Sequence, residues 1–371
     1  MQKYFDRIVR SIREMISFDS SQTPPEDGMP FGRGAAKCLG AFLALAGSLG
    51  FQTRNYDNYA GEVVFGEGEE FAILCHLDVV PAGGGWTHPP FGGEIEDGKL
   101  FGRGAMDDKG PAVICLYCLK ALKDEGFAPR KKIKLIVGCN EESGWACIER
   151  YNRCAHMPET GFSPDADFPV IYAEKGILHF KAAFPVGNAP FTKLYGGERA
   201  NMVCAFAAAE GVKETAGYEN SGLTYKDGAL CARGVSAHAS TPDEGENALG
   251  KLLAFFSVQN EGVKRAYDIL FADCLGLKKF ADETGGLTMS PDVAEYENGT
   301  LYITTDIRYP ATMKQKDVTD VLDRAGVRYE LLHCQPPLFN DKDGELVRTL
   351  LEVYEERTGK KAEPLAIGAG T

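Results

Sequence analysis

The sequence lacks the features that mark membrane proteins and nucleic-acid-binding proteins. Its longest apolar stretch, at about residues 38–51, is too short and too rich in small residues to cross a bilayer. Lys and Arg number 40 against 53 Asp and Glu, and the net charge of −13 argues against a nucleic-acid partner. The same charge disfavours anionic membrane surfaces. The composition, 44% hydrophobic and 25% charged, is that of an ordinary soluble globular protein.

An export signal and a disulfide framework are missing as well. Residues 1–17 combine arginines with apolar residues at helical spacing, which predicts an amphipathic helix rather than a secretory signal. The eleven cysteines are odd in number and irregularly spaced. Cys115 and Cys118 fall within a helical pattern, where we expect buried core cysteines rather than a metal or redox pair. These absences predict a protein of the reducing cytoplasm.

Strands and helices alternate in the first part of the chain. Continuous apolar runs at residues 71–75 and 133–137 predict strands that are buried on both faces. Apolar residues at helical spacing predict a helix over residues 109–122 between these strands. A second N-terminal helix is expected at about residues 34–49, where Gly50 provides a stop signal. This order of elements predicts an α/β domain.

A second domain is predicted by a change of pattern after residue 176. The chain of 371 residues is long enough for about two domains. The next segment predicts an inserted α+β domain over residues 177–333, with strands near 178–184 and 301–308 and helices near 248–258 and 313–324. We expect residues 1–176 and 334–371, including a last helix near 341–358, to form the first domain.

Acidic residues and one histidine follow the predicted strands. H-L-D places His76 and Asp78 at the end of the first buried strand, and E-E-S-G places Glu141 and Glu142 at the end of the second. Ligands of α/β sheets bind beyond the carboxyl ends of strands. Because Glu141 and Glu142 are adjacent, their side chains are expected to diverge, one toward a metal and the other toward an activated water molecule.

Two more acidic groups complete the pattern. Asp107 and Asp108 lie in a glycine-bracketed loop at the start of a predicted helix, and Asp165 lies in S-P-D-A-D-F-P. Each group alone also fits a plainer interpretation, such as a surface turn or a helix cap. Several such groups in order, each near a strand end, are hard to obtain as independent turns. The set predicts a two-metal hydrolase, with zinc as the default for mixed histidine and carboxylate ligands and manganese or cobalt as substitutes.

These residues lie in motifs of a known family. The run G-G-W-T-H-P-P-F-G-G-E-I-E-D-G-K-L-F-G-R-G-A-M-D-D-K-G closely resembles the metallopeptidase family of aminoacylase, acetylornithine deacetylase and carboxypeptidase G. H-L-D-V-V-P-A-G and G-F-S-P-D-A-D-F-P-V-I-Y-A-E-K-G are most similar to its PepV-type (Xaa-His) dipeptidase branch. The resemblance covers essentially the whole chain. It implies a zinc-peptidase-like catalytic domain, with a mixed sheet flanked by helices, and an inserted lid domain.

The resemblance also implies a role for each residue of the cluster. His76 and Asp165 would hold one zinc ion, Glu142 would hold the other, and Asp107 would bridge them. Glu141 would act as the general base, and Asp78 would orient the ring of His76. The peptide bond between Asp107 and Asp108 would be cis, so that the side-chain directions suit both metals.

Three residues of the inserted domain match positions of the family that contact substrate. His238 in G-V-S-A-H-A-S and Asn201 in R-A-N-M-V would stabilise the oxyanion. Arg308 in D-I-R-Y-P would hold the substrate carboxylate bidentately. The ordinary alternatives are a capped turn for His238, a helix start for Asn201 and a strand-end salt bridge for Arg308.

A second histidine ligand is expected near the end of the catalytic domain. After Asp165 the sequence contains His179, His238 and His333, of which the first and last are expected to be structural strand residues. In the family a glycine-rich stretch lines the substrate pocket where this chain has I-G-A-G-T, at residues 367–371. The family's histidine ligand follows that stretch in a segment that this sequence does not contain.

The sequence as a whole predicts a two-zinc dipeptidase that hydrolyses dipeptides or short peptides with metal-activated water. One alternative is an N-acyl amino acid deacylase or amidase of the same family. Another is a catalytically incompetent protein in which one metal site is incomplete. The expected partner is a small peptide substrate, and the protein is expected to be a monomer or a homodimer formed through the lid.

Overall fold

The computed structural model describes residues 2–212 and 217–368, in two compact units. Unit 1 covers Met1–Asp167 and unit 2 covers Phe168–Thr371. This division falls before the predicted boundary at residue 176, and the assignment of residues 334–371 to the catalytic domain stays a prediction. Residues 369–371 of the glycine-rich terminus lie outside the described residues.

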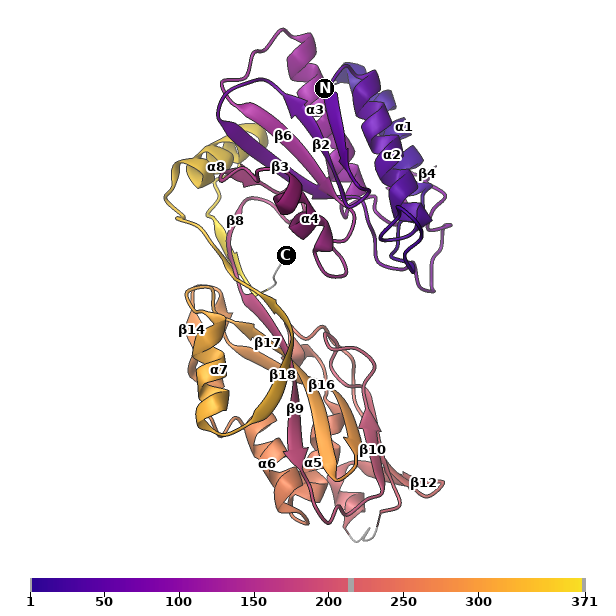
Figure 1. Cartoon of the computed structure of the whole chain (residues 1–371), viewed down its shortest axis with the longest axis vertical. Helices are drawn as coiled ribbons and strands as arrows, with labels where there is room; N and C mark the ends of the chain where they lie inside the picture. The colour runs from indigo at the N-terminus through magenta and orange to yellow at the C-terminus, as the bar shows by residue number, and fades with distance from the viewer. Residues whose placement is uncertain (1, 213–216, 369–371) are drawn as a thin grey trace. The chain divides into compact units, whose positions relative to one another are not determined.

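Unit 1 is built on a mixed five-stranded sheet in the order β1-β2-β6-β3-β7 (Figure 1). β3 pairs in parallel with both β6 and β7, whereas β1, β2 and β6 pair antiparallel. The strands are β1 (Gln52–Tyr56), β2 (Ala60–Phe65), β3 (Glu70–His76), β6 (Lys132–Gly138) and β7 (Gly161–Phe162). The predicted mixed sheet is therefore confirmed, and the two predicted apolar strands are β3 and β6.

Helices cover both faces of this sheet, as the continuous apolar strands require. Leu135 and Val137 of β6 join a core with α1 (Phe5–Ile16), α2 (Arg33–Ser48) and α3 (Lys109–Asp124). Ile136 points to the other face, where it packs with Tyr151 of α4 (Ala146–Cys154). The smaller elements are the 3-10 helix η1 (Gln2–Tyr4) and a hairpin of β4 (Glu94–Glu96) and β5 (Lys99–Phe101).

The prediction for the cysteine pair is wrong in part. Cys118 is exposed and Cys115 is half-buried, because α3 turns this side away from the sheet. All eleven cysteines are free thiols.

Unit 2 contains an eight-stranded antiparallel sheet in the order β12-β13-β11-β10-β16-β17-β9-β18. In chain order these strands are β9 (Gly176–Pro185), β10 (Lys193–Gly196), β11 (Phe206–Glu210), β12 (Leu223–Lys226), β13 (Ala229–Arg233), β16 (Thr288–Glu297), β17 (Thr300–Tyr309) and β18 (Arg328–Gln335). Their apolar side chains form one core with α5 (Ala248–Ser257), α6 (Glu261–Leu270) and α7 (Gln315–Arg324). This architecture confirms the predicted α+β lid.

The rest of unit 2 is a smaller assembly around β8 (Ile171–Glu174). β8 pairs antiparallel with β19 (Leu338–Phe339) and in parallel with β20 (Leu365–Ile367), and α8 (Glu345–Thr358) packs on it through Val347. The remaining short elements are β14 (Ala281–Asp282), β15 (Gly285–Gly286), η2 (Tyr218–Ser221), η3 (Pro242–Glu244) and η4 (Leu277–Lys279).

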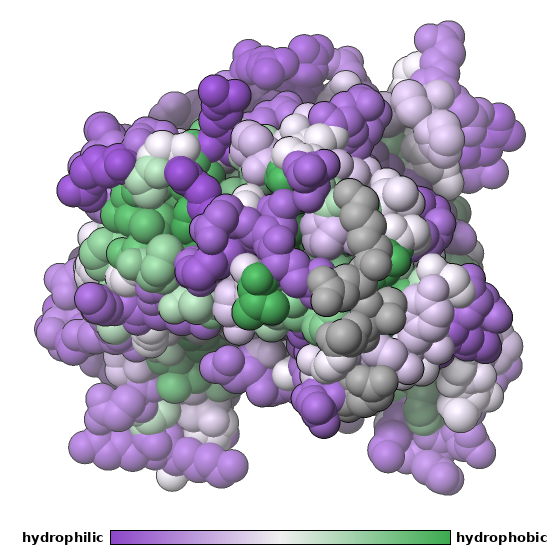
Figure 2. All heavy atoms as spheres, turned by 90° about the horizontal axis from the view of Figure 1, so that it is seen from below, coloured by the Kyte–Doolittle hydropathy of each residue, from purple (hydrophilic) through white to green (hydrophobic). Residues whose placement is uncertain are grey.

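The surface agrees with the acidic, charged composition. Figure 2 shows mostly hydrophilic side chains on the end of unit 2, with apolar side chains in small areas between them. Within the described ranges, no helix combines the length and the apolar character that crossing a bilayer requires.

Candidate metal centre

The topology of unit 1 brings the predicted ligands to one edge of its sheet. His76 is the last residue of β3, and it lies beside Gly138, the last residue of β6. Glu141 and Glu142 follow β6 directly, and Asp165 follows β7. Because β3, β6 and β7 run in parallel, their carboxyl ends meet at the same edge. The loop before α3 adds Asp107 to this edge.

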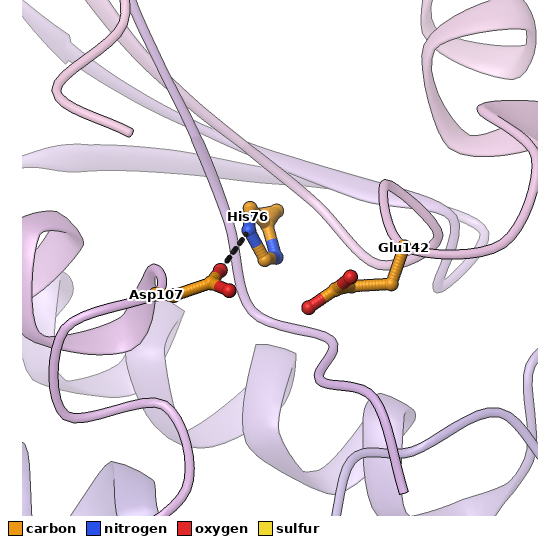
Figure 3. A group of neighbouring side chains, drawn as sticks. All are labelled: His76, Asp107 and Glu142. Atoms are coloured by element: carbon orange, nitrogen blue, oxygen red, sulfur yellow. Dashed lines mark ion pairs between the residues drawn. The ribbon is translucent and has the colours of Figure 1, made fainter. Parts of the chain in front are cut away.

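Two groups of potential ligands result, and both contain His76. One consists of His76, Asp107 and Glu142, and the other of His76, Glu141 and Asp165. Within each group the ligand atoms lie within 4.8 Å of one another. Figure 3 shows the first group, with the carboxylates of Asp107 and Glu142 directed toward the ring of His76. The adjacent glutamates thus belong to different groups, as the prediction of diverging side chains requires.

The ring of His76 directs a buried nitrogen toward the carboxylates of this cluster. Nδ1 lies 3.0 Å from the backbone oxygen of Asp78, which places the proton on Nδ1 and the lone pair on Nε2. Nε2 is buried and has no hydrogen-bond partner among the described residues, although Asp107 Oδ1 lies at 2.9 Å and Asp165 Oδ2 at 3.4 Å. A nitrogen lone pair surrounded by carboxylate oxygens fits a divalent cation. We conclude that the residues suit the metal ions that the sequence predicts.

The electrostatics agree with this conclusion. Burial lowers the pKa of His76, but the carboxylates of Asp107, Asp165 and Asp78 outweigh it and hold the pKa well above its usual value, so they favour positive charge at Nε2, where a bound cation would replace the proton. Burial also raises the pKa of Glu141 and of Glu142 to about 7 each, and nearby carboxylates contribute to both shifts. The negative potential of the crowded carboxylates opposes the ionisation of each further carboxyl group, and a bound cation would relieve this repulsion.

Asp78 connects the two halves of the cluster. Its buried carboxylate accepts the backbone N–H groups of Glu141 and Glu142, each at 3.1 Å, and lies 3.5 Å from Nδ1 of His76. The predicted orienter of His76 therefore acts most closely through its backbone oxygen, while its carboxylate fixes the glutamate turn. The motif H-x-D does not predict the contact between the Asp78 carboxylate and the glutamate turn, because this contact depends on how the chain folds after β6.

Asp108 does not play the helix-capping role that its position in the sequence suggested. It is the N-cap residue of α3 but makes no side-chain capping bond. Its fully buried carboxylate accepts the backbone N–H of His76 at 3.0 Å, and burial raises its pKa to about 7. The predicted cis peptide between Asp107 and Asp108 is confirmed.

Supporting contacts that the sequence did not reveal come from the segment after α1. Ser20 donates to the backbone oxygen of Leu77 at 2.6 Å, which steadies the strand end beside His76. Asn140 donates to Ser143 at 2.9 Å and to Gln22 at 3.3 Å, within the turn that carries the two glutamates. Nothing in the local sequence marks Gln22, since its partners are more than a hundred residues away.

The predicted lid residues lie in unit 2. An isolated bridge between Met202 and His238 and a bond from the N–H of Ala239 to the oxygen of Asn201, at 3.0 Å, hold Asn201 beside His238. Both side chains are exposed. Nδ1 of His238 lies 2.7 Å from the hydroxyl of Ser240, which is the capped turn considered as its alternative. Partial burial and the charge of Arg308 lower the pKa of His238.

Arg308 lies near the end of β17, where it forms the salt bridge considered as its alternative. Its partner is Asp306, at 2.8 Å.

The other histidines of unit 1 join no ligand group among the described residues. His88 pairs with Glu94 at 3.0 Å, and His156 pairs with Glu70 at 3.1 Å.

Comparison with known proteins places these observations in a family. Residues 72–371 match the model of peptidase family M20/M25/M40. The chain is 36% identical to the putative dipeptidase YtjP of Bacillus subtilis, over 98% of this chain and 86% of that protein. It is 33% identical to the Beta-Ala-Xaa dipeptidase of Lactobacillus delbrueckii subsp. lactis, over 99% of this chain and 86% of that protein.

Solved structures share the fold at low sequence identity. The dipeptidase Dug1p of Saccharomyces cerevisiae aligns with a TM-score of 0.61 at 13% identity, over 100% of this chain and 86% of the other. The M20 family metallo-carboxypeptidase Sso-CP2 of Sulfolobus solfataricus aligns with a TM-score of 0.60 at 16% identity, over 98% and 86%.

Proposed function

The chain belongs to peptidase family M20/M25/M40, and from this premise we propose that it is a dipeptidase that works with two divalent metal ions. The observation that carries the proposal is the buried Nε2 of His76, which faces carboxylates without a hydrogen-bond partner among the described residues. The relatives named above as dipeptidases support the choice of a short peptide as substrate.

In this proposal Asp107 would hold both ions, His76 and Asp165 would hold one of them, and Glu142 would hold the other. Zinc is the default ion for such ligands, and manganese or cobalt could replace it. When bound, the ions supply a Lewis acid that polarises a peptide carbonyl and lowers the pKa of a water molecule.

Glu141 moves the proton. It stands in a ligand group with Asp165, and burial raises its pKa toward neutral pH, as suits a carboxylate that accepts and then releases a proton. Its carboxylate would accept the proton of the attacking water and then deliver it to the leaving amine. The bond from its backbone N–H to Asp78, at 3.1 Å, holds it at the strand edge.

The lid residues complete the proposed reaction. Asn201 and His238, which lie side by side, would donate hydrogen bonds to the oxyanion that develops on the scissile carbonyl. Arg308 would pair with the carboxylate of the substrate and so select peptides with a free C-terminus.

A substrate panel tests the proposal and separates it from deacylase activity. Hydrolysis of an unblocked dipeptide is compared with that of an N-acetyl amino acid and of the N-acetylated dipeptide, each with zinc or manganese present. We expect the unblocked dipeptide to have the highest kcat/KM. Preference for the N-acetyl amino acid would support the deacylase instead, and no hydrolysis of any compound would contradict the proposed function.

A further inference from the structure

Arg308 belongs to a buried ionic network on the sheet of unit 2. Asp306 lies two residues before it on β17, and His179 of β9 lies directly opposite Asp306 in the strand pairing. His333 of β18 pairs with His179 in turn, and the two rings are 5.4 Å apart. Three neighbouring strands thus place ionisable side chains around one arginine in the interior of a sheet.

Asp306 uses both of its oxygens in this network. Oδ1 accepts Nε–H of Arg308 at 2.8 Å, and Oδ2 accepts Nη2–H of Arg308 at 2.9 Å. Oδ2 also lies 2.9 Å from Nε2 of His179. Asp306 is fully buried; this burial opposes ionisation, but the bonds from His179 and Arg308 prevail and hold the pKa of Asp306 below its ordinary value. The carboxylate is therefore charged and fixed from two sides.

This pairing leaves one edge of the guanidinium unused. Asp306 occupies the edge formed by Nε and Nη2, whereas Nη1 makes no hydrogen bond with any residue that the structure describes. An arginine has five N–H donors in a rigid plane, so an anchor on one edge fixes the direction of the other. Because Arg308 is only 4% exposed, the surrounding residues also restrict the orientation of its side chain.

We propose that Asp306 and His179 are positioning residues, which hold the Arg308 guanidinium by one edge and so present its Nη1 edge to the carboxylate of a peptide substrate. The inference rests on the proposed function, because it assumes that Arg308 meets a C-terminal carboxylate. Asp306 fixes the arginine directly, and His179 fixes Asp306. Without this anchor the arginine could turn its charge toward other groups or toward water, and its contact with the carboxylate would weaken.

A second buried aspartate provides a matched control. Asp292 of β16 is also fully buried, accepts a hydrogen bond from Ser290, and has one oxygen without a partner among the described residues. It makes no hydrogen bond to Arg308. Replacing Asp292 perturbs the same sheet without removing the anchor of the arginine.

The test measures the selectivity for a free carboxylate by equilibrium binding. In a Glu141→Gln background, which suppresses turnover, calorimetry gives the Kd of an unblocked dipeptide and of its C-terminal amide with zinc present. We expect the dipeptide to bind at least about tenfold more tightly than its amide, as charge-assisted bidentate bonds do. Asp306→Asn and His179→Ala should bring this ratio close to one through weaker binding of the dipeptide. His179→Gln, which keeps an N–H donor, should recover most of the selectivity, and Asp292→Asn should keep it.

The outcomes that would overturn the positioning role are distinct. An unchanged ratio in His179→Ala and Asp306→Asn would remove both residues from carboxylate recognition. An equal loss in Asp292→Asn would indicate a general disturbance of the sheet, and a native protein that binds dipeptide and amide alike would contradict the inference directly. Hydrolysis by the protein with native Glu141, measured in parallel, tests the proposed function separately, because the binding ratio does not depend on turnover.

Discussion

One buried aspartate at the candidate metal centre contacts several neighbours at once. Asp78 accepts the backbone N–H groups of both glutamates of the turn, and its own backbone oxygen fixes the tautomer of His76. Asp78 can in this way set the direction of a proposed metal ligand and of the proposed base. Mutation of such supporting groups typically lowers metal affinity or activity by about 10- to 100-fold.

Asp78→Asn should therefore lower kcat/KM for a dipeptide by about 10- to 100-fold. The asparagine keeps the shape of the side chain, but its NH2 group faces a backbone N–H where Asp78 offered an acceptor. Steady-state kinetics with circular dichroism as a check on folding measure the effect. Glu94→Gln, at an exposed residue of the β4 hairpin, is the control. Native kinetics in Asp78→Asn would show that the glutamate turn does not need this carboxylate.

Asp292 predicts a pH dependence of stability. Burial raises its pKa to about 9, whereas the ordinary value is 3.8, so between these values the folded state holds a proton that the unfolded state has lost. Its contribution to the free energy of unfolding is complete below pH 3.8 and disappears as the pH rises through about 9. Asp292→Asn cannot ionise, and its stability relative to the native protein should increase from pH 5 to pH 8.

Denaturant unfolding of both proteins at these two pH values measures the difference. A difference in unfolding free energy that does not change with pH would mean that Asp292 is already ionised in the folded state.

The members of the candidate metal cluster could be found in the sequence because each lies in a short local motif, after a strand or before a helix. The cluster of His76, Asp107, Glu141, Glu142 and Asp165 comes together as that pattern implies. The contacts of Asp78, Asp108 and Gln22 could not be predicted, since they join residues that only the folded sheet makes neighbours. The chemical roles of all these residues remain proposals.

At the scale of elements, the strongly periodic segments were predictable to within a few residues. The helix predicted at residues 109–122 is α3, Lys109–Asp124, and the second N-terminal helix is α2, Arg33–Ser48. β1 was not predicted, because four of its five side chains are exposed and its sequence, Q-T-R-N-Y, has no apolar face. The last helix begins at Glu345 rather than near residue 341, since Asp341 and Gly344 form a turn before it.

The orientation of α3 on the sheet predicts how much each of two substitutions on this helix lowers the free energy of unfolding. Leu116 is fully buried in the core of unit 1, whereas Ile114 is 43% exposed. Leu116→Ala should lower the free energy of unfolding by about 2–5 kcal/mol. Ile114→Ala should change it by no more than about 0.5 kcal/mol. Urea unfolding measures both, and similar losses in the two variants would contradict the packing of α3 described above.

At the scale of the whole molecule, the sequence predicted two architectures and the structure contains both. The change from a mixed sheet to an antiparallel sheet follows the change of pattern near residue 176, because β3 and β6, which α3 connects, pair in parallel. The contact boundary after Asp167 lies earlier, since β8 joins β19 and β20 from the end of the chain. Pairing over such a sequence distance leaves no local signal.

The metal content per chain shows whether the His76 cluster binds divalent metal ions. Purified protein is saturated with zinc, freed of unbound ions and subjected to elemental analysis beside His76→Ala and Glu94→Gln. We predict at least one tightly held ion in the native chain, rising toward two at saturating zinc, with the content lost in His76→Ala and kept in Glu94→Gln. A native protein that retains no zinc, or a His76→Ala variant that retains as much as the native chain, would mean that this cluster is not a metal site.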